Sequence, residues 1–525
     1  MRWPQQFLLF ALVFVGVMLM HAPLLRLPYF WDEAGYYIPA ARDLYLTHSL
    51  VPHSTPSNAH PPLVMAWLAL AWRVAGYSTL VTRTAMLALS AFSLLGLFRL
   101  ARFAANTHVA IATTVLTALY PVYFTQSSLA HVDLPAAGLT FWGLLAYLDG
   151  RPWRQALWFS LAALAKETAI LTPVALLAWE ITASLIRPRW EQFLPPASRF
   201  RAGILSLILP GLPLAGWFAY HFAKTGYLFG NPEFFRYNVA ATLNPLRFPF
   251  ALGMRLWQVF GYFGLYLLTL TAGLAMFRRP QVARGDATRS RIPLWMQAAI
   301  LAVLVVYLGF MSLVGGAVLA RYMLPVVPLV ILIWVSTLWR RLRYWKLVVG
   351  AVAIAFVAGL FTNPPYGFSL EDNLAYRDYI VLHAEASRFL ALRYPRARVL
   401  TAWPASDELT RPWLGYVAQP VPVVRIEDFS APQVALAAAA HGQFDVVLAF
   451  STKYQPPHPL LENWEAWQHI KEKFFGYHRD LAPETIAQTL GGRIVFQKQA
   501  EGQWIAVIAP DTEQDAELRP QAGLH

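Results

Sequence analysis

The chain has 525 residues, of which 57% are hydrophobic and only 14% are charged, and its mean hydropathy is +0.42. In a typical soluble protein about a quarter of the residues are charged, so this composition excludes an ordinary soluble enzyme and indicates a membrane protein with many spans. The net charge of +13 does not indicate a nucleic-acid partner, since most basic residues lie in short loops between apolar runs, and the lack of cysteine excludes disulfides and thiolate metal sites.

Apolar runs follow one another over residues 1–362. Judged against the ~17–25 residues that a bilayer requires, they predict about eleven transmembrane helices: 7–24, 80–98, 108–124, 134–149, 155–166, 169–186, 202–222, 256–277, 292–313, 322–339 and 346–362. We interpret the first run as an uncleaved span, because no small-residue cleavage site follows it.

The distribution of basic residues predicts the orientation of these helices. One set of alternate connections carries most of the clustered charge: Arg99, Arg102, Arg151, Arg154, Arg187, Arg189, Arg199, Arg201, Arg278, Arg279, Arg284, Arg289, Arg291, Arg340, Arg341, Arg343 and Lys346. Cytoplasmic loops are enriched in Lys and Arg, so this set is expected inside. The first loop, 25–79, and the region after the last span are then both outside.

The first outer loop carries an acidic pair, Asp32 and Glu33, in the stretch YFWDEAGYYIPAARDL. Apolar residues recur after the pair at helical spacing, which predicts a helix along the membrane surface: Tyr37, Ile38, Ala41, Leu44 and Tyr45. The pair could simply start this helix, since Asp is a good N-cap and Glu is favoured in a first turn. Carboxylates near lipid headgroups are costly to desolvate, so a functional role is also considered.

A second acidic position follows the third span, in AHVDLPAAGL. Asp133 precedes Leu134 and Pro135, so capping of the fourth span is the simple interpretation. However, spans one and three both end on the outer face with a carboxylate, so both can border one cavity. Two carboxylates there can divide the work, one accepting a proton from a nucleophile and the other stabilising charge at an anomeric carbon.

Several basic residues are also expected on the outer face. Lys166, in LAALAKETAILTP, either pairs with Glu167 or binds a phosphate. Arg321, in ARYMLPVVPL, begins the tenth span from outside and could bind a phosphate through two parallel hydrogen bonds. His60 precedes two prolines and is either a surface residue or a further hydrogen-bond donor to a phosphate.

Outward carboxylates and cations beside apolar surface suit a substrate with a phosphate headgroup and a long lipid tail, such as a sugar on a polyprenyl phosphate. Its leaving group is a stabilised anion, so a base and cations suffice for transfer. No Gly-rich phosphate loop or dinucleotide-binding fingerprint occurs in the membrane part, so a sugar nucleotide is not the expected donor.

Two further outer segments are expected. The segment 224–255 is rich in aromatic residues and is predicted to be a loop. Residues 363–525 alternate helix and strand signals and end in a hairpin around Gly502, which predicts an extracytoplasmic α/β domain. Its expected strands and helices are 374–393 (helix), 398–403, 421–426 and 444–450 (strands), and 431–441 and 463–476 (helices).

The chain resembles the GT-C glycosyltransferases, in particular the bacterial family that includes aminoarabinose transferases and protein O-mannosyltransferases. The resemblance covers about 1–340 and is carried by four motifs: YFWDEAGYY, HPPL, AHVDLPAAGL with LAKETAILTP, and RYMLPVVPL. It implies a GT-C transmembrane catalytic domain at 1–362, in which Asp32 is the catalytic residue with Glu33 beside it. It further implies that Asp133 contacts substrate or acceptor and that Lys166 binds the donor phosphate.

This sequence departs from the family pattern at two histidines. His60 stands where aminoarabinose transferases often have Lys before Pro-Pro, and His131 stands where many relatives have a basic residue ahead of the acidic one. Both are kept as candidate phosphate ligands, and the first departure argues against assuming lipid A as the acceptor.

The expected function is therefore inverting transfer of a sugar from a polyprenyl-phosphate donor to a lipid, glycan or protein acceptor on the outer face of a bacterial cytoplasmic (inner) membrane. No metal ligand set is predicted, although carboxylates and a phosphate could attract Mg²⁺ or Mn²⁺. The alternatives are a lipid-linked glycan flippase or transporter, and a membrane scaffold with an α/β binding domain.

Overall fold

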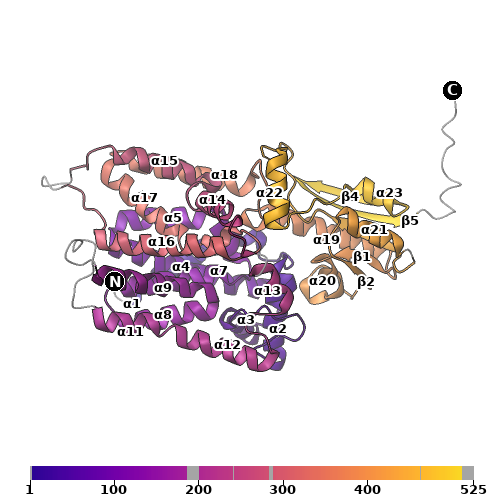
Figure 1. Cartoon of the computed structure of the whole chain (residues 1–525), viewed down its shortest axis with the longest axis horizontal. Coiled ribbons are helices and arrows are strands. Elements are labelled where there is room, and N and C mark those ends of the chain that lie inside the picture. The colour runs from indigo at the N-terminus through magenta and orange to yellow at the C-terminus, as the bar shows by residue number, and fades with distance from the viewer. Residues whose placement is uncertain are drawn as a thin grey trace. The chain divides into compact units, whose positions relative to one another are not determined.

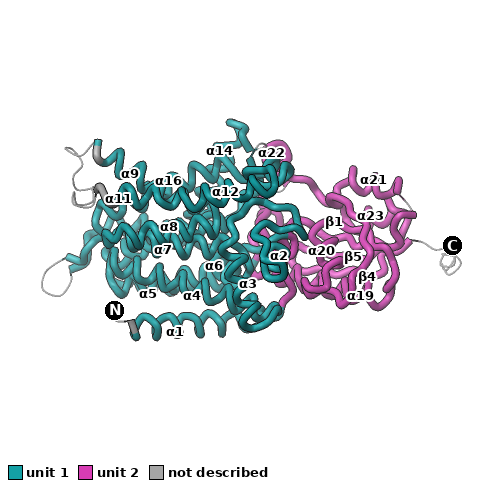
Figure 2. The backbone as a smooth tube through the Cα atoms, turned by 90° about the horizontal axis from the view of Figure 1, so that it is seen from below, with its two compact units in different colours: residues 1–26, 36–362, 371–373 teal, residues 27–35, 363–370, 374–525 magenta. Residues whose placement is uncertain are grey.

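The structure, a computed structural model, divides into two compact units that interleave along the chain (Figure 2). Unit 1 comprises 1–26, 36–362 and 371–373, and unit 2 comprises 27–35, 363–370 and 374–525. The structure describes residues 3–185, 200–239, 242–282, 288–440, 442–461 and 463–510. The basic positions Arg187, Arg189, Arg199 and Arg284 and the segment 511–525 lie outside these ranges.

Unit 1 is helical. Its α-helices are α1 (Trp3–His21), α2 (Ile38–Thr47), α3 (Leu63–Ala75), α4 (Thr79–Ala104), α5 (Thr107–Leu119), α6 (Pro121–Ser128), α7 (Asp133–Leu148), α8 (Pro152–Ala165), α9 (Leu171–Leu185), α11 (Phe200–Ile208), α12 (Gly211–Thr225), α13 (Pro232–Asn238), α14 (Arg247–Phe260), α15 (Leu265–Met276), α16 (Leu294–Leu313), α17 (Val327–Arg341) and α18 (Trp345–Phe361). Short 3₁₀ segments connect several of them: η1 (Ala22–Leu24), η3 (Glu167–Ile170), η7 (Tyr262–Gly264) and η8 (Ala320–Met323). The long helices run side by side in Figure 1.

Five helical segments among the described residues are long and apolar enough to cross a membrane: Pro4–Leu24, Thr79–Ala104, Gly203–Thr225, Arg247–Met276 and Leu294–Leu313. The predicted span 108–124 corresponds to two helices, because α5 and α6 meet at a 68° bend where Pro121 opens α6. Counting this bent pair as one span gives six. The other predicted spans correspond to shorter helices such as α8, with 14 residues, and about 1.5 Å per residue leaves such a helix short of a ~30 Å bilayer core.

The predicted surface helix is confirmed as a helix. It is α2, preceded by a π-helical turn, η2 (Glu33–Tyr37), and it buries Ile38, Ala40 and Ala41. The prediction of a loop over 224–255 is wrong, because the segment contains α13 and the start of α14. Asn231 caps α13 by accepting a hydrogen bond from the Phe234 N–H at 3.0 Å, a capping signal that the aromatic composition obscured.

Unit 2 contains a five-stranded sheet in the order β2-β1-β3-β5-β4. The strands are β1 (Val399–Ala402), β2 (Val423–Ile426), β3 (Val446–Phe450), β4 (Gly492–Ala500) and β5 (Gln503–Pro510), and the helices are α19 (Ala375–Arg393), α20 (Ala405–Thr410), α21 (Ala431–Ala439), α22 (Glu465–Phe475) and α23 (Pro483–Thr489), with η10 (Pro412–Leu414). The 3₁₀ turn η9 (Leu370–Asp372) begins in unit 2, but its residues 371–372 belong to unit 1. β1 pairs in parallel with β2 and β3, whereas β5 runs antiparallel to β3 and β4. The predicted strands, helices and hairpin are confirmed, and β3 is apolar throughout because it is central and buried.

Small residues bring α4, α7 and α8 close together in unit 1. A Cβ placed on Gly138 of α7 would lie 2.5 Å from Ser93 Cβ of α4, and one on Gly143 would overlap the Phe159 ring of α8. Small residues at such contacts let helix backbones approach closely. This packing positions the start of α7 beside the end of α8, where the candidate site lies.

We predict that Gly138→Val lowers the apparent Tm of the purified protein, since overpacking of a tight contact costs about 1–3 kcal/mol. The matched control is Gly216→Val on α12, where an added Cβ would meet no heavy atom within 4 Å. Tryptophan fluorescence melts in lipid nanodiscs measure both variants. Equal shifts for the two variants would contradict the close α4–α7 contact.

Candidate functional site

Four charged side chains from distant parts of the sequence form a buried ion cluster in unit 1. Lys166 Nζ lies 2.5 Å from Asp133 Oδ1, and Arg321 Nε lies 3.3 Å from Asp133 Oδ2. Arg321 Nη1 in turn lies 2.5 Å from Glu371 Oε2. All four residues are at most 5% exposed. Taking each ion out of water costs several kcal/mol, so the cluster exists only because the partners compensate one another.

Local structure determines where each of these side chains points. Asp133 is the first residue of α7, but the N-cap is Val132 and no side-chain cap is made, so the carboxylate is directed to the cations. Lys166 follows the last residue of α8 in an extended conformation. Arg321 and Glu371 lie on the 3₁₀ turns η8 and η9. Each member therefore projects from a helix end or a short turn.

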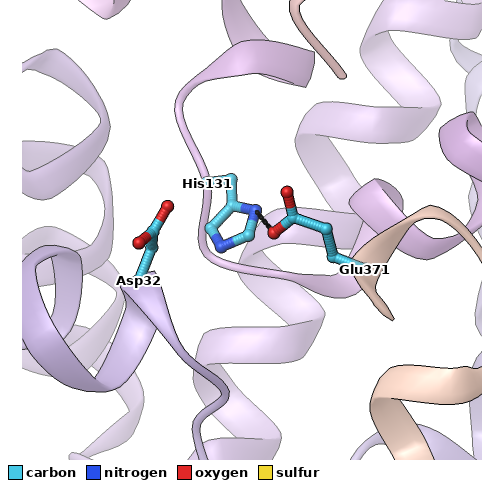
Figure 3. A group of neighbouring side chains, drawn as sticks. All are labelled: Asp32, His131 and Glu371. Carbon is cyan, nitrogen blue, oxygen red and sulfur yellow. Dashed lines mark ion pairs between the residues drawn. The ribbon is translucent and has the colours of Figure 1, made fainter. Parts of the chain in front are cut away.

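His131 lies beside the ion cluster, in the link between α6 and α7. Its Nδ1 is 2.8 Å from Gln126 Oε1. The same nitrogen lies 3.8 Å from Glu371 Oε2 (Figure 3). Burial, together with the neighbouring cations Arg321, Arg83 and Lys166, lowers the pKa of His131 well below its usual value. The imidazole is therefore neutral. Nδ1 also lies 3.1 Å from Arg321 Nη1, which can only donate. Nε2 has no hydrogen-bond partner among the described residues.

Three cationic side chains lie close to the ring of Tyr322. Lys166 Nζ lies 4.0 Å from the ring centroid, and the guanidinium carbons of Arg255 and Arg321 lie at 5.5 and 5.7 Å. Arg255 is fully buried on α14 and donates to Met311 O and Leu319 O. Its Nη2 has no hydrogen-bond partner within the described part of the chain. An aromatic ring face attracts such cations, and Arg255 Nη2 is available as a donor to a further anion.

His60 pairs with Glu167, the residue that follows Lys166 of the ion cluster. Its Nδ1 lies 2.8 Å from Glu167 Oε2, and its ring stacks on Tyr37 with centroids 5.9 Å apart. Burial alone would raise the pKa of Glu167, but His60 and Lys166 outweigh it and hold that pKa at about 2. Tyr37 also lies 5.6 Å from the His131 ring. Aromatic contacts thus connect the two histidines.

The acidic pair Asp32 and Glu33 belongs to unit 2, in the segment 27–35. Glu33 is fully buried, and its Oε2 accepts a hydrogen bond from the Phe30 N–H at 2.9 Å. Asp32 is half-buried. These positions give Glu33 a role in fixing the backbone turn that presents Asp32.

The backbone at this turn is strained. Trp31 adopts φ +43°, a region that a bulky residue rarely occupies. Within unit 2 its ring packs edge-on against Trp403 and Tyr379, with centroids 5.4 and 5.6 Å apart. The Tyr416 hydroxyl also donates to Tyr29 O at 3.1 Å. Strain held in place by surrounding contacts is characteristic of functional sites.

The structure thus brings Asp133, Lys166, Arg321 and His131 together, with His60 one residue further, and describes Asp32 and Glu33 within unit 2. The alternative ion pair between Lys166 and Glu167 is replaced by two others, Lys166 with Asp133 and Glu167 with His60.

The sequence analysis missed Glu371 and Arg255. Glu371 follows the last predicted span, in SLEDN, without periodicity or motif to mark it. Arg255 lies at the edge of a predicted span, where an ionisable residue in an apolar run is itself a signal of function.

His131 and Glu371 also offer ligand atoms for a divalent cation, since imidazole nitrogen and carboxylate oxygen both bind such ions. In unit 1 Arg321 already contacts the same Glu371 oxygen. A cation bound to that oxygen would therefore compete with the guanidinium.

The arrangement of apolar helices defines a membrane protein with the GT-C fold. It is similar to the crystal structure of ArnT from Cupriavidus metallidurans bound to undecaprenyl phosphate, with a TM-score of 0.54, 13% identity, and coverage of 96% of this chain and 98% of that one. The apo structure of the same protein gives a TM-score of 0.52 and 15% identity, with 95% and 97% coverage. At these identities the similarity shows the fold alone.

A family model adds sequence similarity to the shared fold. Residues 59–213, which include Asp133 and Lys166, match the model described as dolichyl-phosphate-mannose-protein mannosyltransferase. A search of curated protein sequences finds no match. The resemblance to the GT-C glycosyltransferases that the sequence motifs predict is confirmed.

We predict that Asp133→Asn lowers the apparent Tm strongly, because loss of one partner of a buried pair costs about 3–5 kcal/mol. The double variant Asp133→Asn/Lys166→Met should lose less than the sum of the two single variants, since it leaves one fewer uncompensated charge.

The control is Asp445→Asn, which breaks an exposed pair with Arg398. Its effect on Tm should be small. An Asp133→Asn effect no larger than that of the control would show that the ion cluster does not stabilise the fold.

Proposed function

We propose that this protein is a glycosyltransferase that moves a sugar from a polyprenyl-phosphate donor to an acceptor on the outer face of a bacterial cytoplasmic (inner) membrane. In this proposal the chain has about eleven spans, and residues 363–525 form an extracytoplasmic α/β domain. The observation that carries the proposal is the buried cluster of Lys166, Arg321 and Arg255 within an apolar helical unit.

The cluster suits a phosphate diester or monoester that enters from lipid. Arg321 can offer two parallel N–H groups to phosphate oxygens, and Lys166 adds a compact charge. Arg255 Nη2 supplies a donor that no described residue occupies. A bound phosphate would share these cations with Asp133 and Glu371, which hold them in place when no anion is bound.

Two comparisons support the donor class. The ArnT structure is described as bound to undecaprenyl phosphate, and the matching family model names a dolichyl phosphate sugar. Both lipids combine a phosphate with a long polyprenyl chain. The apolar helices and the buried cations of unit 1 offer complementary surfaces to both parts of such a molecule.

The proposed reaction is a single displacement with inversion. Asp32 accepts the proton of an acceptor hydroxyl while that oxygen attacks the anomeric carbon, and the bond from this carbon to the phosphate oxygen breaks. The polyprenyl phosphate leaves as an anion stabilised by Lys166 and Arg321. Glu33 fixes the turn that carries Asp32, and Asp133 orients the cations.

The two histidines have subordinate roles in this proposal. Neutral His131 can donate one hydrogen bond, and His60 acts through Glu167 on the position of Lys166. Mg²⁺ or Mn²⁺ would be held through His131 and Glu371, and transfer assays with and without EDTA separate a metal-assisted reaction from one that uses the guanidinium of Arg321 instead.

We predict that Asp32→Asn abolishes release of the sugar from a radiolabelled undecaprenyl-phosphate sugar in nanodiscs, whereas donor binding and the melting curve stay close to wild type. The amide keeps the shape of the carboxylate but cannot accept a proton. Asp445→Asn is the matched control and should transfer normally.

Full transfer by Asp32→Asn would show that Asp32 is not the base. Donor binding without any sugar release in the wild type would favour the flippase or transporter.

We further predict that Arg255→Gln weakens undecaprenyl phosphate binding by about tenfold or more, since a hydrogen bond to a charged group contributes about 1.5–3 kcal/mol. Native mass spectrometry of the purified protein with added lipid measures the bound fraction. The control is Arg73→Gln, an exposed arginine that contacts His48. Equal binding by both variants would exclude Arg255 from the phosphate site.

A further inference from the structure

Unit 1 also contains a cavity of about 420 Å³ between residues 51–57 of the first loop and residues 221–231 at the end of α12 and the start of α13. This volume lies within the ~300–1,000 Å³ typical of small-molecule sites. None of its lining residues is Asp, Glu, Lys or Arg. The cavity therefore differs in kind from the ion cluster.

Hydrogen bonds fix the walls of this cavity. The buried carboxylate of Asp43 accepts the N–H groups of His53 and Ser54, each at 2.8 Å. On the opposite wall, Asn231 donates its backbone N–H and its side-chain N–H to Ser57 O, at 2.8 and 3.0 Å. The two loops are thus held together around a preformed hollow, which lowers the entropic cost of binding.

A serine and a histidine meet at the cavity wall. His221 Nδ1 lies 2.7 Å from Tyr227 O, which can only accept, so Nδ1 carries the proton. His221 Nε2 therefore accepts the Ser57 hydroxyl at 2.8 Å. The Ser57 oxygen also accepts the Ala59 N–H at 3.2 Å. Ser57 and His221 thus satisfy each other at the cavity wall, and the lining contains no aspartate, glutamate, lysine or arginine.

A row of aromatic side chains connects the cavity with the ion cluster. Tyr36 is hydrogen-bonded to Ser57 and lies 6.2 Å from the His60 ring. His60 stacks on Tyr37, which in turn contacts His131. Tyr36 and His60 therefore connect the cavity wall at Ser57 with the residues around the proposed phosphate site.

We propose that this cavity binds the acceptor and that the acceptor is a neutral, hydroxyl-bearing carbohydrate. This inference rests on the proposed function. The lining contains no lysine or arginine, and the Asp43 carboxylate lies 3.5 Å from the ring of His53, so the cavity disfavours an acceptor phosphate. No lining residue lies on a β-strand whose edge could pair with an extended peptide. Val51, Pro52, Pro56 and Tyr227 offer apolar faces for the C–H side of a sugar ring, and the exposed side chains of His53 and Tyr227 carry polar atoms that can meet its hydroxyls.

The test uses the full chain in phosphatidylcholine nanodiscs, because alkyl glycoside detergents would compete. Saturation-transfer difference NMR is recorded with the methyl glycosides of glucose, galactose, mannose and N-acetylglucosamine, with glucose 6-phosphate, and with the peptide acetyl-Ala-Ser-Ala-amide. We expect saturation transfer to at least one methyl glycoside and none to the peptide or the phosphate.

Two variants locate the binding. Val51→Trp fills the cavity, and Ser54→Trp blocks its exposed rim without disturbing packed residues, so each should weaken glycoside binding by about tenfold or more. The control is Val74→Trp on α3, at a position that is 81% exposed and does not line the cavity. It should bind like the wild type.

Failure of every glycoside to bind, binding of only the phosphate or the peptide, or unchanged glycoside binding in both cavity variants would overturn the inference. Undecaprenyl phosphate binding is measured on the same samples, so that failure of the acceptor inference can be distinguished from failure of the proposed function. Lipid binding without glycoside binding removes the acceptor inference alone. Glycoside binding without lipid binding contradicts the proposed donor and leaves the cavity as a carbohydrate site.

Discussion

The organisation of unit 1 depends on one interaction, the buried carboxylate of Asp133 between Lys166 and Arg321. Three charges removed from water are tolerated only if they stay together, so this contact constrains the ends of α7 and α8 and the turn η8. The close approach of α7 to its neighbours at Gly138 makes that contact geometrically accessible. In the proposed function, a lipid phosphate would take the place of one of these anions beside Lys166 and Arg321.

The sequence predicted three members of this cluster because each stands at the end of an apolar run. Asp133, Lys166 and Arg321 could be chosen from local pattern and from the family motifs, and they lie together in the structure. Their pairing could not be predicted, because Lys166 has an acidic neighbour in the sequence and yet pairs with Asp133 in space. Glu371 could not be found either, since only tertiary contacts bring it to Arg321.

The predicted fold was most accurate where side-chain periodicity is strong. The strands and the terminal hairpin of unit 2 follow alternating or wholly apolar runs, and each lies within a few residues of its prediction. Span lengths were less predictable, because Pro121 bends one run and several helices are shorter than a bilayer core. The segment 27–35 gave no sign that it would cluster with unit 2, since Trp31 is fixed there by rings more than 300 residues away in sequence.

Basic side chains gather at only one of the two sites described in unit 1. They surround Tyr322, whereas no lysine or arginine lines the cavity at Ser57 and His221. Tyr36, Tyr37 and His60 connect the two sites. Such a division matches a reaction in which one partner carries a phosphate and the other carries only hydroxyls. The central claim is that the ion cluster receives the lipid phosphate.

A cryo-electron microscopy structure of the full chain in nanodiscs with added undecaprenyl phosphate tests this claim most directly. The account predicts headgroup density within hydrogen-bond distance of Lys166 Nζ and the Arg321 guanidinium, with the polyprenyl tail along the apolar helices. Density for the headgroup elsewhere, while Lys166, Asp133 and Arg321 keep their mutual contacts, would contradict it.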